Sequence, residues 1–153
     1  MKTVWVSGAS TGIGFATAKK FLNNKWKVII SSSNYEKLIL AKKELLLKSE
    51  NKELYSYKCD ISDRNQVTET VNKITKQIGN INLAILNAAA YTPNKEQVFS
   101  IQNFEKLIDV NLKGTLFCIE SLINNMKNNQ NHIAIMASPV GYRGLPTRAA
   151  YGL

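Results

Sequence analysis

Three glycines lie close together near the start of the chain, in the segment Ser7-Gly8-Ala9-Ser10-Thr11-Gly12-Ile13-Gly14. The segment follows a short apolar run and precedes residues with helical spacing. A turn without side chains lets backbone amides and the positive end of a helix dipole approach a pyrophosphate. The segment therefore predicts a dinucleotide-binding loop. A glycine turn that merely joins a strand to a helix is the alternative.

Other polar residues follow later apolar runs of the chain. Asp60 comes after the run that ends at Cys59, and Asn87 comes after the run that ends at Leu86. Asp60 could be only part of a helix start, although Ser62 or Asp63 could supply that capping signal anyway.

Short apolar runs alternate with longer amphipathic segments along the whole chain. The runs have the length of strands and the segments between them carry apolar residues at helical spacing. The predicted strands are Val4–Val6, Trp26–Ile30, Leu54–Cys59, Leu83–Leu86 and Ile133–Met136. The predicted helical stripes are Phe15, Ala18 and Leu22; Leu38, Ala41 and Leu45; Val67, Val71, Ile74 and Ile78; and Leu112, Leu116, Ile119 and Ile123.

This alternation predicts an α/β fold with a doubly wound parallel sheet, the three-layer Rossmann arrangement, in which helices cover both faces. The expected strand order is 3-2-1-4-5, and a dinucleotide would bind across the carboxyl ends of the strands. No linker or repeat divides the chain, so residues 1–153 are expected to form one NAD(P)-binding domain.

Several motifs resemble those of the short-chain dehydrogenase/reductase family. The glycine spacing GxxxGxG is one, and Leu86-Asn87-Ala88-Ala89 is similar to the family's Asn-Ala-Gly signature, with Ala89 in the glycine position. Asn111 matches the family's helix asparagine, and Tyr151 lies thirteen residues beyond Ser138, the spacing of the family's catalytic serine and tyrosine. The motifs agree in order over nearly the whole chain.

The resemblance implies a reversible interconversion of an alcohol and a carbonyl by hydride transfer. Ser138, Tyr151 and Asn111 would be catalytic. The residues expected to bind the cofactor are Gly8, Ser10, Thr11, Gly12, Ile13, Gly14, Ser32, Ser33, Asp60, Ile61, Asn87, Ala88 and Tyr151.

The chemistry explains these residue types, because a developing alkoxide needs a proton and its oxygen a hydrogen-bond donor. Tyr151 would supply the proton and Ser138 the hydrogen bond. A free phenol has a pKa of about 10, so a phenolate near neutrality needs a neighbouring positive charge. In the family, a lysine four residues after the tyrosine supplies it.

The chain reads Tyr151-Gly152-Leu153 and ends before that lysine position. The family's domain also continues into further strands and into the segment that closes over the substrate. We therefore expect the 153-residue chain, as a C-terminally truncated form, to be inactive on its own. A noncatalytic NAD(P)-binding remnant is the alternative to an active reductase.

Cofactor and substrate are weakly encoded. After the second predicted strand stands Ser31-Ser32-Ser33-Asn34, with no carboxylate to bind a ribose 2′-hydroxyl and repel a 2′-phosphate, which favours NADP over NAD. No arginine stands at this turn, and Thr11 occupies a loop position where NADP-preferring relatives often carry a basic residue. The substrate is expected to be a small alcohol or carbonyl compound, with Tyr91, Val140 and Tyr142 as possible pocket walls.

Composition and charge bear on partners and location. The net charge is +9, but the lysines are scattered without a dense basic run, so no nucleic-acid partner is expected. Cys59 and Cys118 have no metal-like spacing and are expected to be small buried side chains. No metal, membrane segment or signal peptide is expected, which favours a cytoplasmic protein. Homo-oligomers are expected only for a full-length form.

A methyltransferase on a similar fold would not explain the spacing of Ser138 and Tyr151.

Overall fold

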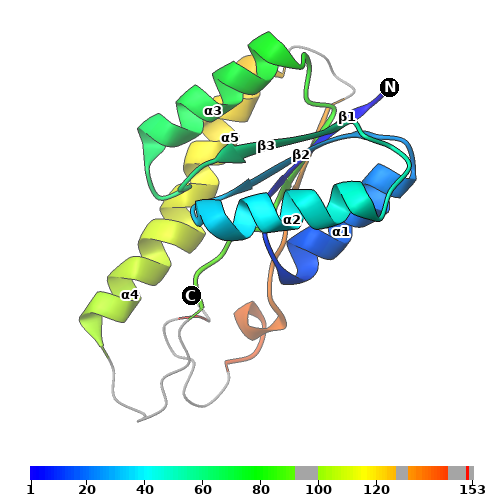
Figure 1. Cartoon of the computed structure of the whole chain (residues 1–153). Helices are drawn as coiled ribbons and strands as arrows, with labels where there is room; N and C mark the ends of the chain where they lie inside the picture. Colours follow the sequence, from blue (N-terminus) through cyan, green and yellow to red (C-terminus); the bar gives the residue numbers. More distant parts are fainter. Residues whose placement is uncertain (92–99, 127–130, 145–150, 152–153) are drawn as a thin grey trace.

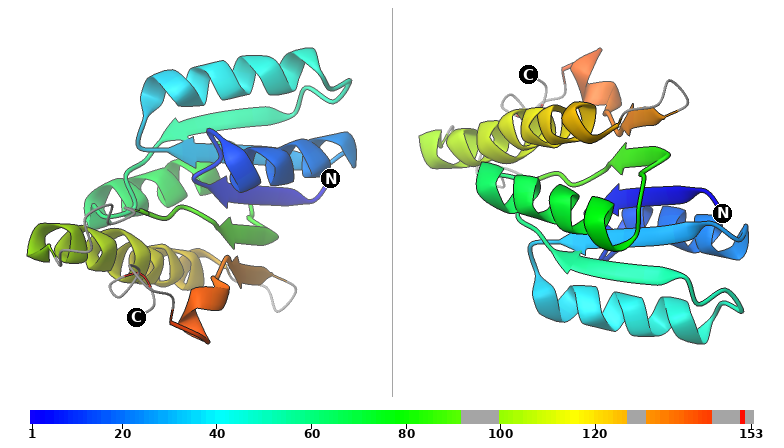
Figure 2. Two further views of the ribbon diagram at one scale, coloured as in Figure 1. Left: turned by 90° about the horizontal axis from the view of Figure 1, so that it is seen from below. Right: turned by 90° about the horizontal axis from the view of Figure 1, so that it is seen from above.

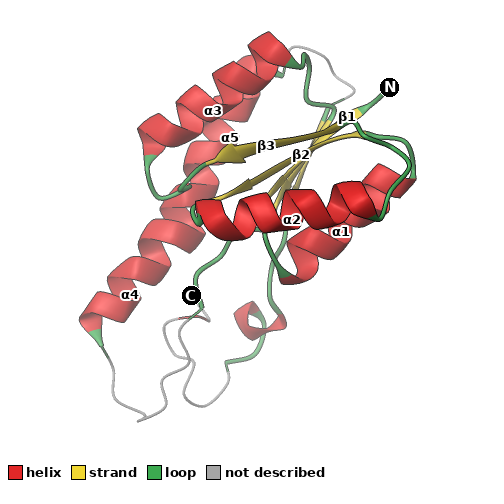
Figure 3. Ribbon diagram, in the orientation of Figure 1, coloured by secondary structure: helices red, strands yellow, loops and turns green. Residues whose placement is uncertain are grey.

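A five-stranded parallel sheet forms the centre of the molecule (Figures 1 and 3). The computed structural model describes residues 1–91, 100–126, 131–144 and 151. The strand order is β3-β2-β1-β4-β5, and every neighbouring pair is parallel, so the predicted order is confirmed. The strands are β1 (Thr3–Ser7), β2 (Lys27–Ser32), β3 (Leu54–Lys58), β4 (Leu83–Leu86) and β5 (His132–Ile135).

Helices cover both faces of the sheet, which gives the predicted three layers (Figure 2). Those on one face are α1 (Gly12–Asn23) and α2 (Tyr35–Leu47), and those on the other are α3 (Arg64–Gln77) and α5 (Thr115–Asn125). The chain therefore folds as a doubly wound Rossmann domain, as the alternation of strands and helices predicts.

Alternate residues of the central strands feed two separate apolar cores. Val4 and Val6 of β1 pack into the core beneath α1 and α2, whereas Trp5 between them packs beneath α3 and α5. This is the two-residue period of a strand that is buried on both faces. The indole of Trp5 is fully buried, and its Nε1–H donates to Ser31 Oγ at 3.0 Å, so the polar atom of this large side chain keeps a partner.

A long helical rod carries Asn111. It comprises α4 (Ile101–Leu107), a π-helical segment η1 (Ile108–Gly114) and α5 without a break. A π-helix makes wider turns than an α-helix, so η1 alters the rotational phase of the side chains along the rod.

The stripe predicted for this rod is wrong at three of its four residues, while the fourth, Ile119, is partly buried and packs against the core. Leu112, Leu116 and Ile123 are each more than half exposed, while Cys118 and Leu122 are fully buried against the sheet. The segment is apolar on more than one side, so helical periodicity alone could not choose the packed face. Small side chains such as Cys118 lie on the packed side.

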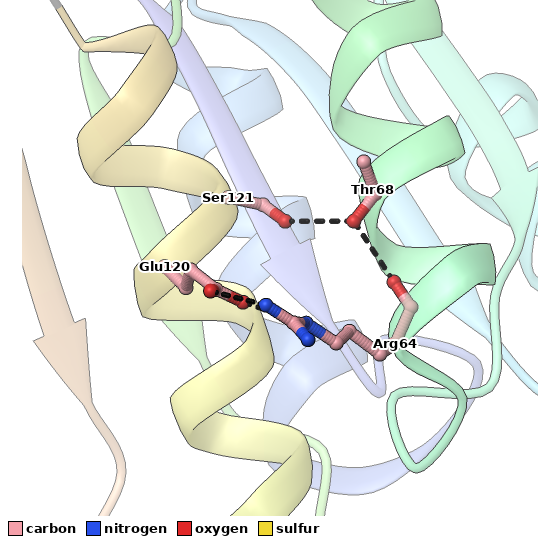
Figure 4. A network of polar contacts seen from close by, with 4 residues as sticks. All are labelled: Arg64, Thr68, Glu120 and Ser121. Atoms are coloured by element: carbon pink, nitrogen blue, oxygen red, sulfur yellow. Dashed lines mark hydrogen bonds and ion pairs between the residues drawn. The ribbon is translucent and has the colours of Figure 1, made fainter.

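Polar contacts join α3 to α5 above this packed side (Figure 4). The Arg64 guanidinium binds the Glu120 carboxylate through both Nε and Nη2, with an Nε to Oε2 distance of 2.9 Å. Thr68 Oγ1 lies 3.4 Å from Ser121 Oγ and donates to the Arg64 carbonyl at 2.9 Å. The pairing fixes the register of α5 against α3, although an exposed ion pair adds little stability.

Among the described residues, β5 is the outer strand beside β4, and its apolar residues Ile135 and Met136 are exposed. Within the part of the chain that the structure describes, no helix has the length and apolar character needed to cross a membrane.

We predict that Leu122→Ala lowers the free energy of unfolding by about 2–5 kcal/mol, because it opens a cavity in a fully buried position. Leu116→Ala, six residues earlier, is the matched control, and it should change stability by less than about 1 kcal/mol because its side chain is half exposed. Urea unfolding measures both. Equal losses would show that the packed face of α5 is assigned wrongly.

Candidate functional site

The glycine loop lies against the end of β4. Gly8 has a φ of +64°, and a Cβ atom at this position would stand 2.6 Å from the Ala88 Cα. A Cβ at Gly14 would stand 2.5 Å from Asn87 Nδ2 and from the Gly8 carbonyl oxygen. Both positions therefore exclude a side chain for reasons of space, and Gly8 also for its left-handed backbone.

Hydrogen bonds tie the ends of β1 and β4 together beneath this loop. The Ser7 hydroxyl accepts from the Asn87 and Ala88 amides at 3.0 and 3.1 Å. Asn87 Nδ2 in turn donates to the Ser7 and Gly8 carbonyls, each at 3.1 Å. The carboxamide of Asn87 thus holds the glycine loop in place, which is a structural role beside its predicted contact with the cofactor.

The first turn of α1 lacks a side-chain cap. Thr11 at its N-cap makes no capping hydrogen bond, whereas Asn34, Asp63 and Ser100 cap α2, α3 and α4. The backbone amides at the start of α1 therefore remain available to an anion beside the glycine loop.

A pocket of about 620 Å³ opens above the glycine loop at the carboxyl ends of the strands. All the predicted cofactor residues line it except Gly12, Gly14 and Tyr151. Gly12 lines a smaller adjoining pocket, and Tyr151 lines another. Gly14 is buried beneath the loop. The residues that line the large pocket are Gly8, Ser10, Thr11, Ile13, Ser32, Ser33, Cys59, Asp60, Ile61, Asn87, Ala88, Ala89, Ala90, Tyr91, Lys106 and Val110.

Asp60 is held at the rim of this pocket by its neighbours. Its Oδ1 accepts from the Ser62 amide at 3.0 Å and from the Ser62 hydroxyl at 2.7 Å. The capping role that Asp60 could have taken falls to Asp63, which accepts from the Asn65 and Gln66 amides. The backbone hydrogen bond from Gln66 is the main reason why the pKa of Asp63 lies below its ordinary value. Asp60 is therefore not the helix cap.

A second pocket, of about 250 Å³, brings together Asn111, Ser138 and Tyr151. These residues come from η1, from the segment after β5 and from the end of the described chain. Ala88 and Ala89 line both this pocket and the large one, so the two adjoin. The Tyr91 ring, at the edge of the large pocket, meets the Tyr151 ring edge-on with centroids 5.0 Å apart.

The side chain of Asn111 is fully engaged with the backbone of Ala90. Its Oδ1 accepts from the Ala90 amide at 2.7 Å and its Nδ2 donates to the Ala90 carbonyl at 3.1 Å. Both ends of the carboxamide therefore fix the loop after β4 to the helical rod. The main-chain carbonyl of Asn111 accepts a hydrogen bond from the Thr115 hydroxyl at 2.7 Å. These contacts give Asn111 a positioning role between the two pockets.

The hydroxyl group of Ser138 can donate a hydrogen bond. Its Oγ accepts from the Val140 amide at 3.3 Å, at the start of a short 3-10 turn, Pro139–Gly141. An oxygen that accepts this bond can still donate its own hydrogen toward the pocket.

Burial raises the pKa values of both cysteines. Cys118 is fully buried in α5, and desolvation raises its pKa to about 12. Burial likewise raises the pKa of Cys59, which lines the large pocket. Both are small core side chains, as predicted. Within the described ranges, no cluster of histidine, cysteine and acidic residues could hold a metal ion.

Sequence reasoning missed several residues of the two pockets. Ser7 gave a signal, because it is a polar residue at the end of an apolar run directly before Gly8. Lys106, Val110 and Thr115 gave none, because their place depends on how the helical rod crosses the sheet. Tyr91, a predicted wall of the substrate pocket, lines the large pocket beside the glycine loop and not the pocket of Ser138.

Two predicted walls lie elsewhere in the structure. Tyr142, at the C-cap of the short 3-10 turn, is 96% exposed and lines neither pocket. Val140 is also absent from the lining of both pockets.

The sequence matches the family profile of short chain dehydrogenases over residues 2–152. The chain belongs to this family. The predicted resemblance is thereby confirmed.

Relatives agree with this assignment and are longer than the chain. An uncharacterized oxidoreductase of Staphylococcus epidermidis is 26% identical over 99% of this chain and 64% of its own length. A sorbose reductase of Candida albicans is 31% identical over 90% of this chain and 49% of its own length. The chain thus spans less than two thirds of these relatives.

A solved structure gives the same fold. An alcohol dehydrogenase from Thermococcus sibiricus, in complex with 5-hydroxy-NADP, superposes with a TM-score of 0.90. The match has 23% sequence identity and covers 99% of this chain and 64% of that one.

We predict that Gly8→Ala lowers the free energy of unfolding by about 2–4 kcal/mol, because the new methyl meets the Ala88 backbone and the φ is positive. Gly12→Ala has a positive φ but no atom within 4 Å of its Cβ, so it should lose only about 1–2 kcal/mol. Chemical denaturation measures both. A similar loss at the two positions would contradict the close approach of Gly8 to β4.

We also predict that Asn111→Ala exposes the loop after β4. Loss of two hydrogen bonds should cost about 1–3 kcal/mol and speed hydrogen exchange of the Ala90 amide. Asn125→Ala, which removes one bond to Ser121 at the far end of the rod, is the control and should leave the Ala90 amide protected. Unchanged exchange in Asn111→Ala would refute the positioning role.

Proposed function

We propose that this protein is an NAD(P)-dependent oxidoreductase that interconverts an alcohol and a carbonyl. The observation that carries the proposal is the meeting of Asn111, Ser138 and Tyr151 around one pocket that adjoins the pocket of the glycine loop. Membership of the short-chain dehydrogenase family supports it.

The residues of the large pocket fit a dinucleotide. Gly8 and Gly14 leave no room for a Cβ, so the loop presents backbone where phosphates would lie. The uncapped start of α1 offers amides to the same group, while Asp60 and Ile61 line the pocket farther along. When bound, the nicotinamide supplies hydride chemistry that amino-acid side chains cannot.

The chain's own residues supply the proton and the polarisation. In the reduction, the Tyr151 phenol gives its proton to the carbonyl oxygen, and in the oxidation the phenolate takes it back. The Ser138 hydroxyl, which accepts from the Val140 amide, donates its hydrogen to the same oxygen. Asn111 acts through the Ala90 backbone and keeps the wall between the pockets in place.

NADP is the proposed cofactor in preference to NAD. Ser31 and Ser32 end β2 and Ser33 follows it, and none of them is a carboxylate that would repel a 2′-phosphate. The archaeal neighbour in complex with 5-hydroxy-NADP supports a nicotinamide cofactor of this kind.

The proposed partner is a small alcohol or carbonyl compound, and the proposed location is the cytoplasm. Nucleic acid is not a proposed partner, because the positive charge is dispersed. Lys48, Lys73 and Lys113 lie on three different helical segments, and each pairs with an acid one turn before it.

For the 153-residue chain alone we propose binding without turnover, because it spans less than two thirds of its enzymatic relatives. Isothermal titration calorimetry with NADPH should show a single binding site. Gly14→Ala should weaken binding at least about tenfold, a loss of roughly 1.4 kcal/mol, because the methyl displaces the loop. Gly144→Ala is the control, since its Cβ meets nothing within 4 Å and Gly144 lines neither pocket.

Two results would contradict this proposal. A folded chain that binds neither NADPH nor NADH would refute the cofactor site. Oxidation of NADPH by the chain with any member of a carbonyl panel would refute binding without turnover, and Tyr151→Phe would then test the proton donor.

A further inference from the structure

A pocket of about 520 Å³ lies at the opposite end of the sheet from the glycine loop. Figure 1 shows that α1 and α2 both end on this side, where the strands begin. The residues that line this amino-end pocket are Met1, Leu22, Asn23, Lys25, Lys48, Ser49, Glu50 and Asn51. None of them lines the large pocket or the pocket of Ser138, so this is a separate site.

We propose that the amino-end pocket binds a small phosphate monoester. The ammonium groups of Lys25 and Lys48 would pair with its charge, and the Ser49 hydroxyl would donate to one of its oxygens. The inference goes beyond the proposed function, because it concerns a second ligand at residues that take no part in the cofactor site.

The hydroxyl group of Ser49 is the observation that points to a ligand. Ser49 is only 8% exposed. Within the described ranges, its Oγ is the one buried side-chain oxygen or nitrogen without a hydrogen-bond partner. A buried hydroxyl that makes no hydrogen bond destabilises a fold, because it has given up its bonds to water. Rotation about the Cα–Cβ bond would turn this hydroxyl to an acceptor in the pocket that Ser49 lines.

The main-chain carbonyls at the ends of the two helices are already engaged, which disfavours a cation as the ligand. The Leu22 carbonyl accepts from Asn51 Nδ2 at 3.0 Å. Lys52 Nζ donates to the Leu46 and Ser49 carbonyls at 2.6 and 2.8 Å. These bonds also hold the loop after α2 against the end of α1, so the wall of the pocket is built before a ligand arrives.

Positive side chains outnumber negative ones around the pocket. Lys25 and Lys48 line it together with Glu50, and Lys48 also pairs with Glu44 at 2.6 Å. Lys52, which binds the Ser49 carbonyl, adds a third ammonium group. Among the residues that the structure describes, no ion pair engages Lys25. Its charge is therefore available to an anion.

Lys25 occupies a backbone position where glycine is usual. Its φ is +60°, and the Trp26 amide donates to the Phe21 carbonyl at 3.1 Å to close the end of α1. A side chain in this left-handed conformation costs stability relative to glycine. An ammonium group presented to the amino-end pocket gives the lysine a use at this position.

A phosphate monoester matches these donors. It carries roughly −1.5 to −2 charges near neutral pH and has three strongly accepting oxygens, for two ammonium groups and one hydroxyl. The pocket is larger than a phosphate group needs and falls within the range of roughly 300–1,000 Å³ that is typical of sites for small organic molecules. The apolar side chains of Met1 and Leu22 would contact the organic part.

Phenyl phosphate is the probe, and an NMR titration of the 153-residue chain tests the inference. The amide signals of Ser49, Glu50 and Asn51 should shift, while those of the glycine loop report separately on the large pocket. Lys25→Gly keeps the left-handed backbone and should weaken binding about fivefold. Lys43→Ala, at an exposed position of α2 outside the pocket, is the matched control and should change the constant by less than about twofold.

Two further variants separate a binding role from a structural one. Ser49→Ala should weaken binding about threefold without lowering the midpoint of urea unfolding, because the hydroxyl has no partner to lose. Glu50→Gln should tighten binding about twofold, because it removes a carboxylate that repels the phosphate.

Three results would overturn the inference. They are shifts confined to the glycine loop, weaker binding in Glu50→Gln, and a lower unfolding midpoint in Ser49→Ala with unchanged affinity. Failure of the chain to bind NADPH would leave this site standing, because the two sites are read from different residues.

Discussion

The close approach of the glycine loop to the end of β4 is the contact on which the rest of the site depends. Gly8 lies so near the Ala88 backbone that a methyl group would not fit between them. Ser7 and Asn87 hold this approach by hydrogen bonds in both directions. Since β1 and β4 are neighbours at the centre of the sheet, the contact sets both the floor of the large pocket and the start of α1.

One short segment after β4 runs from the floor of the large pocket to the second pocket. Ala88 and Ala89 line both pockets, and Ala90 is clamped by the carboxamide of Asn111. The π-helical segment around Asn111 interrupts a long rod whose α5 portion is fixed against α3 by Arg64 and Glu120. π-Helical segments occur often at functional sites of proteins, and here the side chain of Asn111 within this segment binds the loop after β4.

The carboxyl ends of the strands and their buried middle portions carry different constraints. At the carboxyl ends, glycine and alanine keep side chains out of the way of the pockets, which leaves the backbone exposed to a ligand. Within the sheet, Val4, Trp5 and Val6 alternate between two cores and are fully buried. Stability therefore resides in the packed strands, while small residues and hydroxyls at their ends line the large pocket.

The sequence by itself determined the strand order, the glycine loop and most of the residues that line the large pocket, because these depend on the alternation of strands and helices and on motifs with fixed spacing. It failed on the face of α5, since Leu116 and Leu122 are equally apolar and only contact with α3 and the sheet decides which is buried. The tertiary structure alone placed Thr115 beside Ser138 and Lys37 beside Ser10. Both depend on how separate helices cross the sheet, which is a long-range property that no local pattern encodes.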